Sequence, residues 1–279
     1  KGLTPTEEEA HFGLWCIMSS PLLIGCNLEN MPDSSLKLLT NKELIALNQD
    51  PLGLQAYVAQ HENEGYVLVK DIEQKRGNVR AVALYNPSDT VCSFSVPFSS
   101  LEFGGNVKVR DLVKHSDLGN FSGTFEQTLP AHSAMFLRIE GETRLEPTLY
   151  EAEWAYLPLF NDLGKNPKGI LYANDKEASG KMKVGFLGGQ PENYAEWREV
   201  YSENGGRYDM TIHYLYGKGR QIELDVNGMI TKIDSLGKDN GHNQITVPVE
   251  LKAGYNTIRM GNSYNWAPDI DCFTLTKAL

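Results

Sequence analysis

The sequence predicts a mainly β protein that begins with an incomplete (β/α) barrel arc. Three observations carry this prediction. Helix-like segments enclose a short apolar run in residues 1–53, and strand-like segments separated by turns follow in residues 54–140. A charged, proline-containing linker at 141–147 then introduces further strand-like segments in residues 148–279. Alternating helices and buried strands are typical of α/β barrels, whereas short strands joined by turns are typical of antiparallel β-sandwiches.

The first element is a helix. Thr4 can cap its start, Pro5 suits the first helical position, and the three glutamates at 7–9 favour the positive end of the helix dipole. Pro21 is expected to stop the helix, because proline cannot continue the hydrogen-bond pattern.

A buried strand and a second helical segment follow. The apolar run at 22–25 has no polar alternation, which predicts a strand buried on both faces. Asp33 or Ser34 can cap the next helix, and residues 41–45 open another helical turn. Helix, buried strand and helix together form one arc of a (β/α) barrel.

From residue 54 the pattern changes to short strands. Turns are expected at 86–89 and at 104–106, where glycine, proline and asparagine gather. The segments with strand composition or alternation are 66–70, 79–85, 91–96, 107–112 and 134–139. An antiparallel β-sandwich is the expected result.

Composition limits the possible functions. The formal net charge of -10 disfavours nucleic acid, whose phosphates require clusters of lysine and arginine. No apolar run approaches the roughly 18 residues of a membrane helix, so no membrane partner is expected. The four cysteines form no CxxC pair, and buried free thiols are favoured over proximity of Cys16 and Cys26.

Four motifs carry a family resemblance. Two lie in the first 53 residues, WCIMSSPLLIG and LTNKELIALNQDPLG, and two follow, VRDLVKHSDLGNFSGTF and LPAHSAMFLRI. They resemble motifs of glycoside hydrolase family 27. This is the α-galactosidase and α-N-acetylgalactosaminidase group, and the resemblance covers roughly residues 2–140. It implies a barrel followed by a β-sandwich, and a retaining mechanism with two aspartates on strands upstream of residue 1.

The chemistry of the visible residues agrees with that implication. A retaining glycosidase needs two carboxyl groups about 5 Å apart, which project from the ends of barrel strands. The expected strand ends in Gly-Cys-Asn at 25–27, where no carboxylate is present. Asn27 is expected as a turn residue, with a place at the rim of a pocket as the alternative. We expect no catalytic residue in this chain. For Arg110, Asp111, His115 and Asp117, the resemblance implies a support role against the barrel.

Two hypotheses for function therefore remain. In the first, the chain is the C-terminal portion of a secreted, extracellular or periplasmic hydrolase of terminal α-galactosides, inactive alone. In the second, it is a noncatalytic carbohydrate-binding protein. The first predicts a complementary N-terminal barrel segment, or self-association, because an isolated arc would expose its apolar residues. Those residues are Trp15, Ile17, Leu22, Leu23 and Ile24.

The third unit resembles carbohydrate-binding modules of families 6 and 35 over residues 148–279, which implies a β-jelly roll. The resemblance lies in the segments YEAE, GRYDMTIHY and IELDVNG and in residues 247–260 and 268–275. Such modules commonly hold a structural calcium ion, Ca2+, bound by hard oxygen ligands. Glu151 and Glu153 alternate on the first strand, and Asp271 on the last strand could lie beside them. These three residues are the expected calcium ligands, with exposed strand acids as the alternative.

Sugar binding in such modules combines aromatic faces with polar side chains that orient hydroxyl groups. The expected ligand contacts are Tyr172, Tyr194, Tyr264, Asn265 and Trp266. Trp197 and Tyr208 are expected in the core instead. At 241–243 the chain has Gly-His-Asn where many relatives place a tryptophan, which argues against the usual stacking pair.

Overall fold

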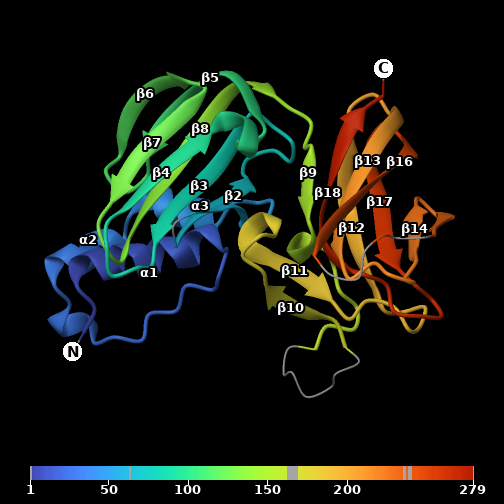
Figure 1. Cartoon of the computed structure of the whole chain (residues 1–279). Helices are drawn as coiled ribbons and strands as arrows, with labels where there is room; N and C mark the ends of the chain where they lie inside the picture. Colours follow the sequence, from blue (N-terminus) through green and yellow to red (C-terminus); the bar gives the residue numbers. More distant parts are fainter. Residues whose placement is uncertain (1, 63, 162–168, 235–236, 238–240, 279) are drawn as a thin grey trace. The chain divides into compact units, whose positions relative to one another are not determined.

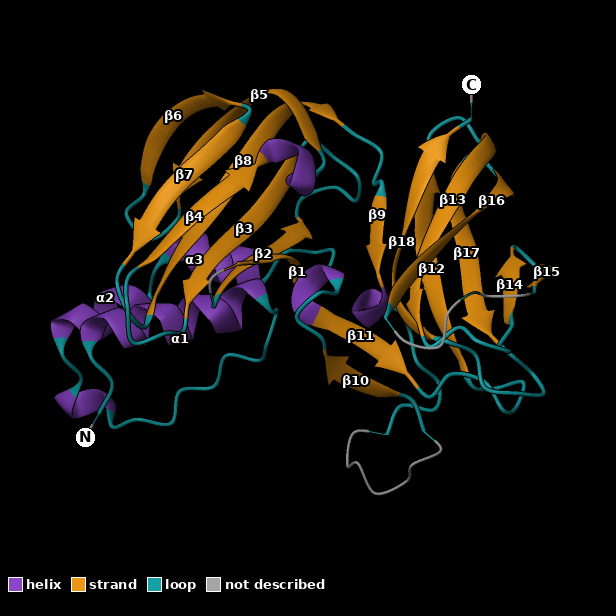
Figure 2. Cartoon of the chain, viewed as in Figure 1, coloured by secondary structure: helices purple, strands orange, loops and turns teal. Residues whose placement is uncertain are grey.

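In the computed structural model, the chain divides into two compact units, Lys1–Leu145 and Glu146–Leu279 (Figure 1). Antiparallel strands dominate both units, which confirms the predicted mainly β fold (Figure 2). Among the described residues, no helix combines the length and the apolar character that crossing a bilayer requires. The structure describes residues 2–62, 64–161, 169–234, 237 and 241–278.

The helices of the first unit begin largely as predicted. Helix α1 (Pro5–Ile17) starts with a capping box, in which the Thr4 hydroxyl accepts from the Glu7 backbone N–H and the Glu7 carboxylate accepts from Thr4 N–H. The Asn41 side chain caps α3 (Lys42–Asn48) through two backbone N–H groups. The predicted side-chain cap of α2 (Asp33–Leu39) is wrong, because Pro32 occupies the capping position and makes no side-chain bond.

The buried strand predicted at 22–25 is not formed. This segment has no regular secondary structure and pairs with no strand among the described residues, and the short helix η1 (Leu28–Asn30) follows it. Leu23 is 87% exposed and Ile24 is 59% exposed, whereas a barrel strand would bury both. A strand requires neighbours for its backbone N–H and C=O groups. The barrel arc therefore stays a prediction. Ile17 was expected to be one of the exposed apolar residues of the arc. It is instead fully buried, and it packs with residues of the sheet.

The strands of the first unit form a six-stranded sheet of order β1-β2-β3-β8-β5-β6 and a two-stranded sheet, β4-β7. They are β1 (Tyr57–Glu62), β2 (Gly65–Asp71), β3 (Val79–Asn86), β4 (Cys92–Pro97), β5 (Phe103–Asp111), β6 (Ser116–Ser122), β7 (Thr124–Leu129) and β8 (Ser133–Arg144). Strands lie at all five predicted positions. The turn predicted at 104–106 is instead a bulge within β5, where the register shifts between Gly104 and Val107. Strands β1, β6 and β7 were not predicted.

The central strands of the large sheet are buried on both faces. Val82 and Leu84 of β3 pack between the two sheets, and the alternating Ala81 and Ala83 pack on the opposite face against the helices (Figure 1). Helix α1 crosses this second face at β8. It approaches so closely that a Cβ added at Gly13 would lie 2.1 Å from the buried ring of Phe136.

Substitution of Gly13 by alanine is therefore expected to destabilise the first unit by about 2 kcal/mol, because overpacking outweighs the better helix propensity of alanine. Urea denaturation of the full chain measures this change. Gly2→Ala is the matched control, since no atom lies within 4 Å of its added Cβ. Equal stability of the two variants would show that the Phe136 ring moves aside without cost.

The second unit has two facing sheets, β10-β11-β18-β13-β16 with β9 also paired to β18, and β12-β17-β14-β15. From β11 to β18, each strand lies in the opposite sheet from the strand before it, except that β14 and β15 form a hairpin in one sheet. This order defines a jelly roll, as expected. Its core contains Trp197 and Tyr208, as predicted. The strands are β9 (Leu149–Glu151), β10 (Leu171–Asn174), β11 (Met182–Gly185), β12 (Tyr194–Ser202), β13 (Gly206–Leu215), β14 (Ile222–Val226), β15 (Met229–Ile233), β16 (His242–Leu251), β17 (Gly254–Gly261) and β18 (Asp269–Lys277).

The connection between the units is shorter than the predicted linker at 141–147. Residues 141–144 belong to β8. Leu145 N–H donates to the Glu102 carbonyl within the first unit, at 2.8 Å. The Glu146 carboxylate accepts from the Glu203 backbone N–H and the Tyr208 hydroxyl within the second unit.

Candidate glycan and cation sites

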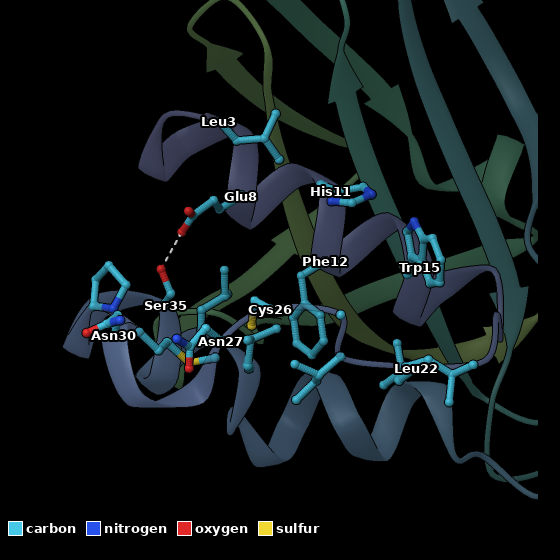
Figure 3. A pocket seen from close by; sticks show the side chains of 17 residues that line it. Leu3, Glu8, His11, Phe12, Trp15, Leu22, Cys26, Asn27, Asn30 and Ser35 are labelled. Atoms are coloured by element: carbon cyan, nitrogen blue, oxygen red, sulfur yellow. Dashed lines mark hydrogen bonds between the residues drawn. The ribbon is translucent and has the colours of Figure 1, made fainter. Parts of the chain in front are cut away.

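A groove of about 640 Å³ opens in the first unit between α1, the segment 22–27 and α2 (Figure 3). Its lining is mainly apolar and includes Phe12, Trp15 and Asn27. The Asn27 side chain also accepts from the Glu29 backbone N–H and so caps η1. Cys26, predicted as a buried thiol, lines the groove and is exposed. Among the described residues Glu8 is the one acid of the lining, and it accepts a 2.8 Å hydrogen bond from the Ser35 hydroxyl. The groove therefore lacks the pair of carboxyl groups that glycoside hydrolysis requires.

The charged residues of the β5–β6 hairpin bind α3. Arg110 donates from Nε and Nη2 to the two carboxylate oxygens of Glu43, at 2.9 and 2.7 Å, and from Nη1 to Asp117 at 2.9 Å. His115 Nδ1 lies 2.8 Å from Glu43 Oε1. Asp111 accepts from the backbone N–H groups of the turn that follows it. Each group thus has a structural partner.

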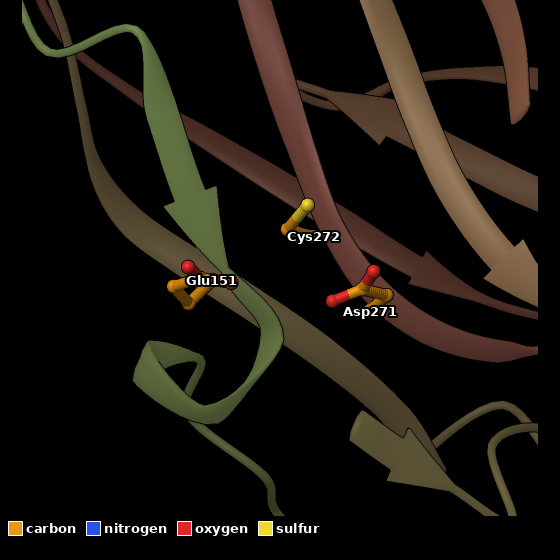
Figure 4. Close-up of side chains that lie close together, drawn as sticks. All are labelled: Glu151, Asp271 and Cys272. Atoms are coloured by element: carbon orange, nitrogen blue, oxygen red, sulfur yellow. The ribbon is translucent and has the colours of Figure 1, made fainter. Parts of the chain in front are cut away.

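The second unit brings acidic side chains from its first and last strands together. The ligand atoms of Glu151, Asp271 and Cys272 lie within 4.8 Å of one another (Figure 4). Cys272 pairs with His213 and Ile270 pairs with Tyr214, so Asp271 is the extra residue of a β-bulge. Bulges redirect side chains, and this one allows adjacent residues of β18 to join the same cluster.

Glu153 belongs to the same cluster, although not for the reason that the sequence suggested. It lies in the turn η3 (Ala152–Trp154) and not on the first strand, so the predicted alternation with Glu151 is wrong. A Cβ added at Gly180 would nevertheless lie 2.5 Å from Glu153 Oε1 and 3.8 Å from Glu151 Oε1. The turn η4 (Ser179–Lys181) therefore packs closely on both carboxylates, and the Ser179 hydroxyl donates to Glu151.

The cluster fits a hard divalent cation. Glu151 Oε2, Glu153 Oε2 and Asp271 Oδ1 are buried without a hydrogen-bond partner, and the side chains of Glu151 and Asp271 are each 5% exposed. Burial, reinforced by neighbouring carboxylates, raises the pKa of Glu151 to about 7, of Glu153 to about 8 and of Asp271 to about 6. Calcium takes carboxylate oxygens as ligands and would supply the charge that these buried groups lack.

The loop between β17 and β18 presents three of the expected sugar-binding residues. Tyr264, Asn265 and Trp266 are exposed, and the Asn262 side chain accepts from the backbone N–H groups of the first two. Gly189 N–H donates to the Asn265 carbonyl at 2.9 Å, which ties this loop to the β11–β12 loop. The fold thus holds an aromatic and an amide side chain on one fixed turn.

Two further aromatic residues at the same end of the jelly roll were not predicted. Phe186 follows β11 and lies edge-on to Trp266, with ring centroids 6.2 Å apart. Tyr216 follows β13, and its ring centroid lies 4.4 Å from Lys183 Nζ. Both are exposed and have positive φ angles, 61° and 58°, which are rare for bulky residues and concentrate at ligand sites. The sequence carries no signal for these angles.

The other two expected sugar contacts lie on strands and not in these loops. Tyr194 is on β12, where the Arg259 guanidinium lies over its ring at 4.9 Å. Tyr172 is on β10 and contacts Phe160. At 241–243, His242 Nε2 lies 3.2 Å from Asp175 Oδ1, so this side chain makes a polar contact in place of a stacking contact.

Comparison with known proteins identifies relatives of the first unit. Residues 1–50 match the family described as Alpha galactosidase A, and residues 64–139 match the Alpha galactosidase C-terminal beta sandwich domain. Alpha-galactosidase 3 of Arabidopsis thaliana is 39% identical over 134 residues, covering 47% of this chain and 31% of that protein. The probable alpha-galactosidase of Dictyostelium discoideum is 30% identical over 142 residues, 50% of this chain and 37% of that protein.

One solved structure resembles almost the whole chain. The isomalto-dextranase of Arthrobacter globiformis T6, complexed with panose, aligns with a TM-score of 0.56 over 98% of this chain and 48% of that one. The identity is 18%, so this likeness concerns the fold alone. The chain spans about a third of the length of the curated relatives named above.

Proposed function

We propose that this chain is the C-terminal portion of a retaining hydrolase of terminal α-galactosides, because its first unit matches the Alpha galactosidase A family at residues 1–50 and the Alpha galactosidase C-terminal beta sandwich domain at residues 64–139. In this proposal, the catalytic aspartates belong to a barrel segment outside this sequence. The chain supplies the β-sandwich and a glycan-binding unit. The complete protein is proposed to act outside the cytoplasm, in the periplasm or the extracellular space.

The uncovered groove is the observation that supports this proposal most directly. It lies within the segment that matches the α-galactosidase family, and its rim exposes Leu23 and Ile24. Exposed apolar surface of this kind marks an interface. A preceding barrel segment would cover these side chains and supply the missing strand neighbours, so the groove is the surface on which a barrel closes.

The second unit is proposed to bind the glycan and a structural calcium ion. Phe186 and Trp266 offer ring surfaces for the C–H face of a sugar, and the Asn265 amide can orient hydroxyl groups. Calcium held by Glu151, Glu153 and Asp271 would fasten β9, η3 and β18 together.

An aryl α-galactoside tests the catalytic part of the proposal. The chain alone is expected to give no hydrolysis above the buffer rate, because its groove lacks a carboxylate pair. The same preparation is expected to be retarded during electrophoresis in galactomannan gels, and Trp266→Ala is expected to weaken this binding about threefold to tenfold. Substantial hydrolysis would contradict the assignment of catalysis to another segment.

Light scattering separates the two candidate functions. A C-terminal portion with an open groove is expected to self-associate as its concentration rises, and Leu23→Asp together with Ile24→Asp is expected to restore a monomer. Ile230→Asp is the control and should leave the association unchanged, because Ile230 is also an exposed isoleucine but lies on β15 of the second unit. A wild-type chain that stays monomeric at every concentration favours the noncatalytic glycan-binding protein.

A further inference from the structure

A second pair of exposed aromatic rings lies outside the loops described above. Phe160 is 41% exposed and Tyr172 is 40% exposed, and their ring centroids are 4.8 Å apart at an interplanar angle of 46°. Phe160 is held by a backbone bridge to Ile170, and the Tyr172 hydroxyl donates to the Glu153 carbonyl at 3.4 Å. The two rings are therefore fixed from separate segments of the chain.

The place of β10 in the sheet explains why these rings stay accessible. Tyr172 is directly opposite Val184, whose side chain is fully buried, so the tyrosine points to the core side of the sheet. Strand β10 is, however, an addition outside the eight jelly-roll strands, and the facing sheet has four strands in the described part of the chain. Asn174 is exposed on the same side, two residues along the strand.

This combination has the chemistry of a sugar contact. Aromatic faces pack on the C–H surface of a pyranose, and a nearby amide can bind its hydroxyl groups. The site also adjoins the loop-end aromatics, because Phe186 is two residues beyond Val184 in β11. Tyr172 pairs with Val184 across the sheet, and two residues of chain separate Val184 from Phe186, so the backbones of Tyr172 and Phe186 lie on the order of 10 Å apart. A di- or trisaccharide spans such a distance, whereas a single sugar does not.

We propose that Phe160, Tyr172 and Asn174 form a second glycan contact, so that the second unit binds an oligosaccharide chain across two aromatic sites. This inference rests on the proposed glycan-binding function and adds the class of ligand. A terminal monosaccharide occupies the loop-end site containing Trp266, and the following sugars reach the Phe160–Tyr172 pair.

Parallel binding measurements on the full chain test this inference. Galactomannan binding is measured by retardation in gels, and galactose binding by NMR titration. Tyr172→Ala is expected to weaken galactomannan binding about threefold to tenfold and to leave galactose binding unchanged. Trp266→Ala should weaken both. Tyr172→Phe loses the long hydroxyl bond to Glu153 but retains the ring and its contact with Phe160, so it should bind nearly as the wild type does and separates ring contact from loss of folding. Tyr255→Ala, an exposed strand tyrosine elsewhere, is the control.

The possible results distinguish a failure of the second contact from a failure of the proposed glycan-binding function. Unchanged galactomannan binding by Tyr172→Ala, with Trp266→Ala still defective, overturns the second contact and leaves the glycan-binding function intact. Loss of galactose binding in Tyr172→Ala but not in Tyr172→Phe would show that the two aromatic sites are one site, and would also overturn the second contact. A wild-type chain that binds neither ligand overturns the glycan-binding function, and the second contact with it.

Discussion

Calcium is expected to raise the melting temperature of the second unit by about 10 °C when its concentration is a hundredfold above the dissociation constant. The expectation follows from the three buried carboxylates of Glu151, Glu153 and Asp271, each with an oxygen that has no hydrogen-bond partner. Uncompensated buried charge is costly, and a cation that binds only the folded cluster removes this cost.

The pH dependence should reverse with the cation. Burial raises the three carboxyl pKa values to about 7, 8 and 6, above the ordinary values of 4.5 for glutamate and 3.8 for aspartate. Without a cation, the folded state therefore retains protons that the unfolded state releases. The stability is fully present below about pH 4 and is lost as the pH rises towards 8. With calcium the ionised carboxylates are ligands, so stability should be greater at pH 8 than at pH 5.

Calorimetry of the full chain at pH 5 and pH 8, in chelator and in calcium, measures both trends. Glu151→Gln together with Asp271→Asn should raise the melting temperature at pH 8 in chelator and abolish the calcium shift. Glu177→Gln, whose side chain is 84% exposed, is the matched control and should behave as the wild type does. If calcium does not change the melting temperature of the wild type at pH 8, the cation site is ruled out.

Local signals in the sequence were sufficient where an element depends on its own residues. Thr4, Pro5 and Glu7 specify the start of α1 through contacts within one turn, and the structure contains that capping box. The segment 22–25 shows the limit of such reasoning, because its apolar character indicates a strand but the pairing that makes a strand depends on neighbours. Strand β6 was missed because most of its side chains are exposed and no apolar alternation marks it.

The candidate site depended on features that residue type does not encode. Asp271 joins Glu151 through a β-bulge, and Glu153 joins through a turn, so the three acids were identified correctly as neighbours although one reason given for them was wrong. Phe186 and Tyr216 have positive φ angles, which their residue types do not predict. Sequence reasoning could identify the chemistry of the second unit, but the grouping of its aromatic residues required the fold.

Arg80→Met is expected to destabilise the first unit by about 3–5 kcal/mol, because it removes one partner from a buried ionic network. The Arg80 side chain is 3% exposed, with Nε 2.9 Å from Asp71 Oδ1 and Nη1 3.4 Å from Glu102 Oε1. Its Nη1 and Nη2 also donate to the Leu101 carbonyl and the Tyr57 hydroxyl. Methionine can fill much of the volume but leaves the two carboxylates with less compensating charge, although Arg144 still contacts both.

The acid sensitivity of this network should be opposite to that of the cation cluster in chelator. Burial alone would raise the pKa of Asp71 and of Glu102, but the neighbouring arginines outweigh burial and lower both values. The network therefore contributes stability that is fully present above the ordinary values near 4 and is lost as the pH falls through the lowered folded-state values. Arg80→Met should make the loss of stability below pH 4 shallower, because it weakens the cause of the lowered pKa.

Urea denaturation at pH 7 and at pH 3, followed by the fluorescence of the full chain and by hydrogen exchange within β3 and β8, measures the change in the first unit. Arg138→Met is the matched control, because Arg138 pairs with the exposed Glu73 and Glu140 and should cost less than about 1 kcal/mol. The contrast between these two arginines isolates burial as the cause, since both lie in the six-stranded sheet and each contacts two carboxylates. If Arg80→Met costs no more than Arg138→Met, the buried network does not stabilise the sandwich, and apolar packing alone must account for its stability.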